Sequence, residues 1–114
     1  MTEDQTVTKL MEIAKMVGYG EIPPFQHDEC FTIGAFDLII PDRENRTKNF
    51  SLLSSICARY EEVKPDKRFL KGYICLLDRL AYATNTTEKP EGMGKIMEEN
   101  PEETKSLREW YRKL

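Results

Sequence analysis

Histidine and tryptophan each occur once in the 114-residue chain, and cysteine occurs three times. Protein zinc sites use spaced pairs of cysteine and histidine such as C-x₂-C, and this sequence has no such pair. Its one group of adjacent potential ligands, His27–Cys30, is a run of consecutive residues. Consecutive side chains do not converge on one ion without a special loop, so we interpret this segment as an exposed polar loop. We expect no metal and no cofactor.

Long hydrophobic runs are also missing. No stretch approaches the ~18 apolar residues of a membrane span, and the N-terminal residues Met-Thr-Glu-Asp-Gln lack the apolar core of a signal peptide. The cysteine count is odd, and Cys57 and Cys75 lie in apolar stretches, which favours reduced and buried thiols. We therefore expect a cytoplasmic protein that does not contact a membrane.

Motifs for catalysis are absent as well. The glycines match neither G-x-x-x-x-G-K-[ST] nor G-x-G-x-x-G. A nucleophilic pair of His27 with Cys57 or Cys75 needs an accessible thiol, whereas both cysteines lie beside apolar stripes. The carboxylates of Asp37, Asp42 and Glu44 are explained more simply as a strand residue and turn or cap residues. We predict that the protein is not an enzyme.

A strong excess of charge of either sign is lacking too. The chain has 17 Lys and Arg against 20 Asp and Glu, a net charge of −3, so it is a small acidic protein with no bulk attraction to nucleic acid. Two stretches are nevertheless locally basic, and they make a nucleic-acid-binding helical domain the alternative function. Their residues are Arg43, Arg46 and Lys48 in the first stretch, and Lys64, Lys67, Arg68 and Lys71 in the second.

The sequence is rich in apolar residues at helical spacing. Positions i, i+3, i+4 and i+7 recur in two adjacent segments, 45–63 and 65–84, which predicts a helical pair at the centre of the fold. If this pair is an antiparallel hairpin, the two basic stretches lie at its opposite ends and do not merge. We predict a mainly α fold, a compact single domain of four or five helices near 3–17, 45–63, 65–84, 93–99 and 101–113.

Helix ends are predicted from capping residues. Thr2–Gln5 has the pattern of a capping box, and Gly18 is expected to end the first helix in a left-handed conformation. Pro65 suits the first turn of its helix because its missing N–H has no partner there. Asn100 followed by Pro101 is typical of an N-cap, so the last helix is expected to begin there.

A small β element is expected near 30–40. Strand-forming residues flank Gly34-Ala35, which predicts either a hairpin of Cys30–Ile33 with Phe36–Ile40 or a single bent strand. Gly72 lies inside a predicted helix at a cost of ~1 kcal/mol relative to alanine. We expect close approach of another backbone to explain its presence, and the 31–36 segment is the candidate.

The C-terminal segment combines methionines and aromatic residues, which are frequent at protein interfaces. We hypothesise a non-enzymatic function through protein–protein interaction, as an adaptor, regulator or inhibitor of viral, phage or mobile-element type, with self-association into an oligomer as one version. The alternative interpretation is that this segment closes the core over the central pair. A ligand pocket lined by His27, Cys30 and Asp37 is a third hypothesis. The candidate interaction residues are Met93, Met97, Leu107, Trp110 and Tyr111, and Leu114 extends the same stripe.

Overall fold

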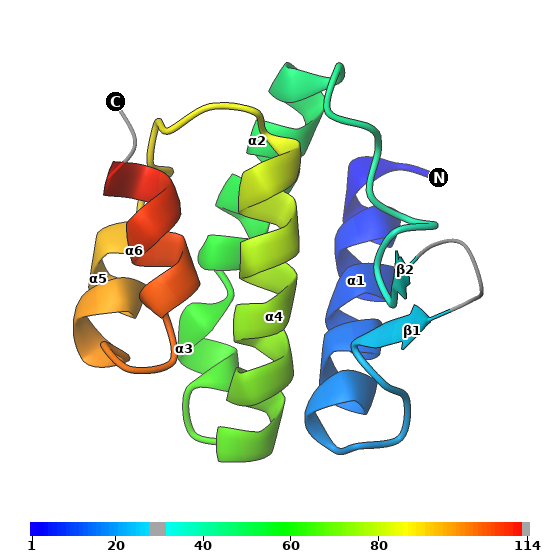
Figure 1. Cartoon of the computed structure of the whole chain (residues 1–114), viewed down its shortest axis with the longest axis vertical. Helices are drawn as coiled ribbons and strands as arrows, with labels where there is room; N and C mark the ends of the chain where they lie inside the picture. Colours follow the sequence, from blue (N-terminus) through cyan, green and yellow to red (C-terminus); the bar gives the residue numbers. More distant parts are fainter. Residues whose placement is uncertain (28–31, 113–114) are drawn as a thin grey trace.

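A computed structural model describes residues 1–27 and 32–112 of the chain (Figure 1). The predicted mainly α fold is confirmed, because helices dominate the described residues and the two strands are short. The helices are α1 (Glu3–Gly18), α2 (Arg46–Cys57), α3 (Tyr60–Val63), α4 (Lys67–Ala83), α5 (Met93–Glu99) and α6 (Lys105–Arg112). The strands are β1 (Phe25–His27) and β2 (Thr32–Gly34).

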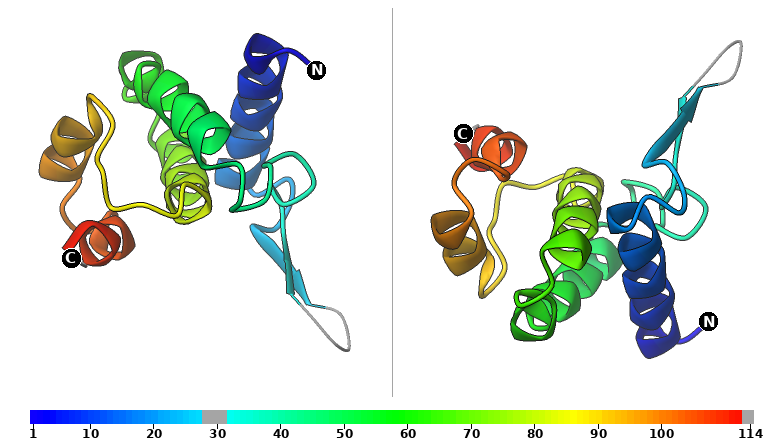
Figure 2. Two further views of the ribbon diagram at one scale, coloured as in Figure 1. Left: turned by 90° about the horizontal axis from the view of Figure 1, so that it is seen from above. Right: turned by 90° about the horizontal axis from the view of Figure 1, so that it is seen from below.

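Helix α4 is the centre of the molecule. Figures 1 and 2 show α1 along one side of it, the α5–α6 pair on the other, and α2 and α3 behind. Its side chains Leu76, Leu77 and Leu80 are fully buried, as is Tyr73, whose hydroxyl donates to the carbonyl of Ile56 at 2.5 Å. The apolar stripe predicted from the sequence therefore forms the hydrophobic core on several sides of one helix.

The backbones of α1 and α4 cross closely at two glycines. A Cβ added to Gly72 would lie 1.8 Å from the carbonyl oxygen of Ala14, and one added to Gly18 would lie 1.9 Å from that of Arg68. Only glycine fits at both positions. The close approach predicted for Gly72 is present, but the approaching element is α1 and not the 31–36 segment.

The N-terminus of α1 agrees with the sequence, whereas its C-terminus does not. The capping box of Thr2 and Gln5 is formed in both directions. Gly18 is the last helical residue, and the left-handed residue is Gly20 at φ 76°. The N–H of Gly20 bonds to the carbonyl of Val17 and that of Glu21 to Met16, which is a Schellman motif. The prediction for Gly18 is wrong because that glycine is needed at the crossing with α4.

The predicted helix 45–63 is divided into α2 and α3. The carbonyl of Ile56 accepts bonds from the N–H of Arg59 at 3.0 Å and from the Tyr73 hydroxyl, and α2 ends beside them. Helix α4 begins at Lys67 because Asp66 caps it, accepting from the N–H groups of two later residues. Pro65 therefore precedes the cap, and the prediction that it lies in the first turn of this helix is wrong.

The β hairpin is displaced from its predicted position. Strand β1 pairs antiparallel with β2, with Phe25 opposite Gly34, and the N–H of Ala35 extends the pair to Pro24. The predicted partner 36–40 is instead a series of turns, because Phe36 is buried in the core and its carbonyl accepts from two following N–H groups. The predicted pairing is wrong on this point, and Cys30 lies outside the described residues.

Of the two C-terminal helices, α5 has its predicted bounds, whereas α6 begins later than predicted. Helix α5 has the expected bounds, and α6 begins at Lys105 after turns at 101–104. Asn100 is not an N-cap, because its amide is buried and donates to the Tyr60 hydroxyl at 3.0 Å and the Ile96 carbonyl at 2.8 Å. The hydroxyl of Thr104, also buried, donates to the Asn100 carbonyl at 2.5 Å.

Candidate functional site

The predicted interaction residues of the C-terminal segment are distributed between core and surface. Met93, Met97 and Leu107 are buried in the hydrophobic core, and Trp110 and Tyr111 are half-buried against it. Leu114 lies outside the described residues. The part of this segment that reaches the surface is therefore its aromatic pair, and Trp110 connects it to the rest of the molecule.

Trp110 packs against Tyr82 at the C-terminal end of α4. The ring centroids of the two residues are 5.6 Å apart and the rings are tilted by 58°. The indole N–H of Trp110 donates to the carbonyl of Thr86 at 2.9 Å, which fixes the orientation of the ring. Tyr82 is 48% exposed, so this aromatic contact borders solvent.

Arg43 covers the ring of Tyr82. Its guanidinium lies 4.0 Å from the ring centroid, within the range of a cation–π contact. Its Nε donates to the carbonyl of Tyr82 at 3.1 Å, and its Nη2 donates to Oδ1 of Asn85 at 2.7 Å. Asn85 adopts a left-handed backbone with φ 53°, directly after the end of α4. Arg43 is therefore held in one position, and no described carboxylate forms an ion pair with it.

Arg79 lies near Arg43 on the same side of α4. Its Nη2 donates to Oδ1 of Asp37 at 2.5 Å, and its guanidinium lies 5.8 Å from the centroid of the Phe25 ring. Asp37 is itself oriented by the N–H of Gly34, which donates to Oδ2 at 2.7 Å. The Nε of Arg79 is buried and has no hydrogen-bond acceptor in the described structure.

A hollow of about 250 Å³ lies between the two arginines. We call the surface around it, formed by Phe25, Arg43, Arg79, Tyr82 and Trp110, the arginine–aromatic surface. Arg79 and Tyr82 are three residues apart on α4 and therefore share a face. The residues that line the hollow are Asp37, Ile40, Pro41, Asp42, Arg43, Arg79, Tyr82 and Ala83. Leu38, which follows the lining residue Asp37 in the chain, is 91% exposed.

The sequence did not predict this surface as a site. Its residues come from β1, the 35–45 turns, α4 and α6, and no local pattern connects segments so far apart in the chain. The one local indication of this surface is that Arg79 and Tyr82, three residues apart, share a helical face. That pair forms a candidate site only when the fold brings Arg43 beside it. The site was only partly anticipated, through Trp110 in one hypothesis and Arg43 in another.

The basic residues of the nucleic-acid hypothesis occupy both ends of α4. The buried amide of Asn49 in α2 donates to the carbonyl of Ala83 at 2.8 Å, so the start of α2 lies at the end of α4. Arg46 and Lys48 are exposed there, whereas the second group lies a helix length away, about 25 Å. In that group Lys64 pairs with Glu99 at 2.9 Å, Arg68 lies 5.7 Å from the Tyr19 ring centroid, and Lys67 and Lys71 are exposed.

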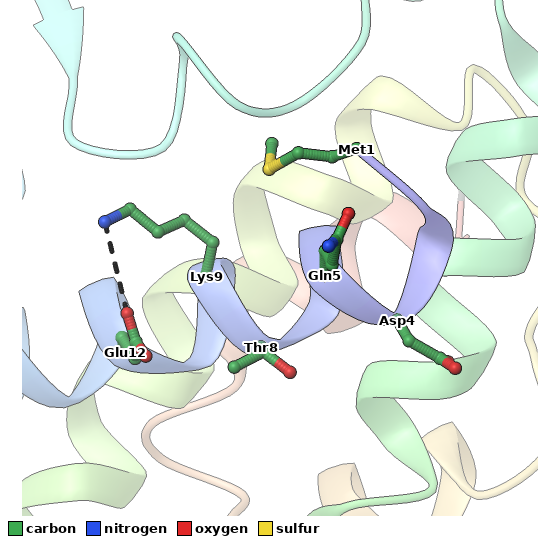
Figure 3. Close-up of a pocket in the computed structure, with 6 residues that line it drawn as sticks. All are labelled: Met1, Asp4, Gln5, Thr8, Lys9 and Glu12. Carbon is green, nitrogen blue, oxygen red and sulfur yellow. Dashed lines mark ion pairs between the residues drawn. The ribbon is translucent and has the colours of Figure 1, made fainter.

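A second hollow, on α1, has little capacity for chemistry. Figure 3 shows the side chain of Met1 extending over Gln5 towards Lys9, with the ion pair of Lys9 and Glu12 beside it. The nitrogen and oxygen of that ion pair are 4.0 Å apart. All the lining residues belong to one exposed stretch of α1 and its N-terminal residue, so the hollow is a shallow surface feature.

The described cysteines are poorly suited to nucleophilic chemistry. Burial raises the pKa of the Cys57 thiol to about 12, and burial together with the nearby Asp78 raises the pKa of Cys75. A thiol with a raised pKa forms little of the reactive thiolate. The hypothetical pocket of His27, Cys30 and Asp37 involves two side chains outside the described residues. Asp42 acts in a turn, where its Oδ1 accepts from the N–H of Glu44 at 3.0 Å.

The described residues include neither a metal-binding cluster nor a helix that could span a membrane. No group of three His, Cys, Asp or Glu side chains is placed to hold a metal ion, among the residues the structure describes. In the same part of the chain, no helix has the length and apolar character needed to cross a bilayer.

Comparison with known proteins gives no match: no family model fits the sequence, and no curated protein or solved structure is significantly similar to it. The arginine–aromatic surface is therefore assessed by its own chemistry. It combines two arginines with three aromatic rings, and each arginine is already positioned over a ring before any ligand binds.

Proposed function

We propose that this chain is a non-enzymatic protein that binds a protein partner through the arginine–aromatic surface. The observation that supports the proposal is the fixed position of Arg43 over Tyr82, beside Trp110. Tryptophan, tyrosine and arginine are the residues most enriched at binding hot spots. A side chain that is already ordered loses less conformational entropy on binding, so its contacts contribute more to affinity.

The role that fits this proposal is that of an adaptor, regulator or inhibitor in the cytoplasm. The exposed Leu38 beside the hollow supports it, because a large apolar side chain in water gains free energy when a partner covers it. Self-association is one version of the same proposal, with a second copy as the partner. Light scattering over a range of concentrations tests this version, and a monomer at every concentration removes it.

The direct experiment compares partner capture by matched variants of the full chain. Tyr82→Glu places a charge on the arginine–aromatic surface and Leu38→Glu places one next to its hollow, whereas Met16→Glu adds a charge at an exposed residue of α1. Proteins captured from the native host are identified, purified and titrated against each variant. We expect the first two variants to lose at least about tenfold in affinity and Met16→Glu to bind like the wild type. Equal binding by all the chains contradicts the proposal.

The alternative is a nucleic-acid-binding domain that uses the basic residues at 43–48 or 64–71. Exposed Lys67 and Lys71 favour it, because the described residues include no ion-pair partner for either. Phosphate contacts release counterions, so this function predicts binding that weakens steeply with salt. Retention on DNA at low salt, lost in Lys67→Gln with Lys71→Gln and kept in Tyr82→Glu, favours the alternative over our proposal.

A further inference from the structure

We infer that the hollow between Arg43 and Arg79 recognises a carboxylate side chain in an acidic segment of the protein partner. This inference rests on the proposed function, because it names the chemistry by which the same surface selects what it binds. It depends on three observations: a buried donor without an acceptor, an arginine without an anionic partner, and apolar walls around both.

The buried donor is Nε of Arg79. It has no hydrogen-bond acceptor in the described structure, although Nη2 of the same guanidinium bonds to Asp37. A buried N–H group without a partner destabilises the folded chain, because it has lost its bond to water and gained no other. An acceptor that gains access to this atom removes that destabilisation, so the guanidinium favours ligands that bring an oxygen.

The second guanidinium is that of Arg43. Its hydrogen bonds go to a carbonyl oxygen and to the amide oxygen of Asn85, and both acceptors are neutral. Its positive charge is consequently not neutralised by an ion pair within the described residues. A carboxylate bonded to an arginine forms a charge-assisted hydrogen bond, about twice as strong as one between neutral groups. The hollow therefore favours an ionised acceptor over a neutral one.

The acidic groups in the wall already have donors. Asp37 accepts from Arg79 and from the N–H of Gly34, and Asp42 accepts from the N–H of Glu44. These bonds reduce the ability of either carboxylate to occupy the free donors of the arginines. One additional carboxylate in the hollow then faces two guanidiniums with unused N–H groups.

The remaining walls are apolar. Ile40, Pro41, Tyr82 and Ala83 line the hollow, and Leu38 is exposed beside it in the chain. Such walls suit the methylene groups of a glutamate and an apolar residue next to it, because both lose contact with water on binding. The preferred segment is therefore a glutamate flanked by leucine or a similar residue.

A protein segment fits this surface better than nucleic acid does. Asp42 lines the hollow and Glu44 is exposed close to it in the chain. These acids oppose a chain of phosphates that extends past the hollow, because like charges repel. A single carboxylate on an otherwise apolar segment meets this repulsion once, whereas a chain of phosphates meets it at every charge.

The test uses nuclear magnetic resonance on the full chain labelled with nitrogen-15, observing the Nε–H signals of the arginines. The probes are an acetylated and amidated peptide with the sequence Gly-Leu-Glu-Leu-Gly, the same peptide with Gln in place of Glu, and oligo-dT. We expect the Glu peptide to shift the Nε–H signals of Arg79 and Arg43 until saturation. The Gln peptide should bind at least about tenfold more weakly, because a hydrogen bond to a charged acceptor is stronger than one to a neutral acceptor.

The matched variants are Arg79→Lys and Arg112→Lys. The first keeps a positive charge opposite Asp37 but removes Nε, and the second makes the same exchange at an exposed residue of α6. We expect Arg79→Lys to weaken binding of the Glu peptide at least about tenfold and Arg112→Lys to leave it unchanged. The backbone amide spectrum of each variant verifies that it is folded.

Three results overturn the inference: equal binding of the Glu and Gln peptides, oligo-dT shifting the same signals more strongly than the Glu peptide, or no shift with any probe. If the inference fails while Tyr82→Glu still abolishes binding of the captured partner, the proposed function is retained without its carboxylate chemistry. If Tyr82→Glu leaves that partner bound, the proposed function fails as well.

Discussion

The guanidinium of Arg43 lies 4.0 Å from the centroid of the Tyr82 ring, although the two residues are separated by nearly forty positions in the sequence. Arg43 joins the turn before α2 to the end of α4, and it does so through the ring and two hydrogen bonds. The same side chain thus stabilises the fold and forms one wall of the hollow. A binding surface built on such a contact is ordered before a partner arrives.

The contribution of Arg43 to stability can be measured directly. We expect Arg43→Ala to lower the free energy of unfolding by about 1–2 kcal/mol, since it removes two hydrogen bonds and a cation–π contact that are partly exposed. Arg46→Ala, at an exposed neighbour, should change it by less than about 0.5 kcal/mol. Urea unfolding of both variants provides the values, and equal values would show that the contact is not formed in solution.

Two glycine-to-alanine substitutions should have opposite effects. Alanine at position 72 places its Cβ against the backbone of α1, so Gly72→Ala should destabilise the protein by about 3 kcal/mol or prevent folding. Gly94, in α5, has open space around its Cα, so Gly94→Ala should stabilise the protein by about 0.5–1 kcal/mol through helix propensity. Thermal melts of the two variants check this, and a stable Gly72→Ala protein contradicts the α1–α4 crossing.

Asp78 predicts a dependence of stability on pH. Burial raises its pKa from 3.8 to about 6, and its Oδ1 is buried without a hydrogen-bond donor in the described structure. Between these two pKa values the folded state retains a proton that the unfolded state releases. Stability from this group is therefore complete below about pH 4, falls as the pH rises towards 6, and is lost above it.

The corresponding variant is Asp78→Asn. Because the side chain is only partly buried, solvent screens its charge, and we expect a gain in unfolding free energy of about 1–2 kcal/mol near pH 7. The gain should shrink as the pH is lowered towards 5. Glu98→Gln, an exposed acid of α5, provides the control and should show neither effect. A gain in stability that is independent of pH contradicts the raised pKa of Asp78.

Helix α6 is predicted to depend on its packing. It has eight residues, fewer than the roughly 12–15 that an isolated helix needs for even marginal stability in water. Leu107 is 1% exposed, so Leu107→Ala should cost about 2–5 kcal/mol, whereas Glu109→Ala on the exposed face should be nearly neutral. A chain truncated after Asn100 should lose its cooperative unfolding transition in calorimetry. A fully folded truncated chain shows that α6 does not stabilise the domain.

Local features of the sequence predicted local structure well. The capping box at Thr2 formed as expected, and α5 has the predicted bounds, because both depend on residues within a few positions of each other. Apolar spacing located the core face of α4 for the same reason. The mainly α fold follows from these elements.

Long-range contacts explain what the sequence did not predict. The break after α2 lies where the hydroxyl of Tyr73 reaches the Ile56 carbonyl, and the end of α1 is displaced because Gly18 meets α4. Asn100 has the sequence pattern of an N-cap, but its side-chain amide donates a hydrogen bond to the hydroxyl of Tyr60 on another helix. The candidate site also depends on long-range contacts, since Arg43 and Tyr82 become neighbours only in the folded chain.

The central claim, that a partner binds the arginine–aromatic surface, is tested most directly by hydrogen exchange with mass spectrometry on the full chain alone and with its captured partner. We expect slower exchange in peptides that cover 37–43 and 79–86, with little change on the exposed face of α1. Slower exchange confined to 64–71 and the end of α1, with 37–43 and 79–86 unchanged, would contradict it.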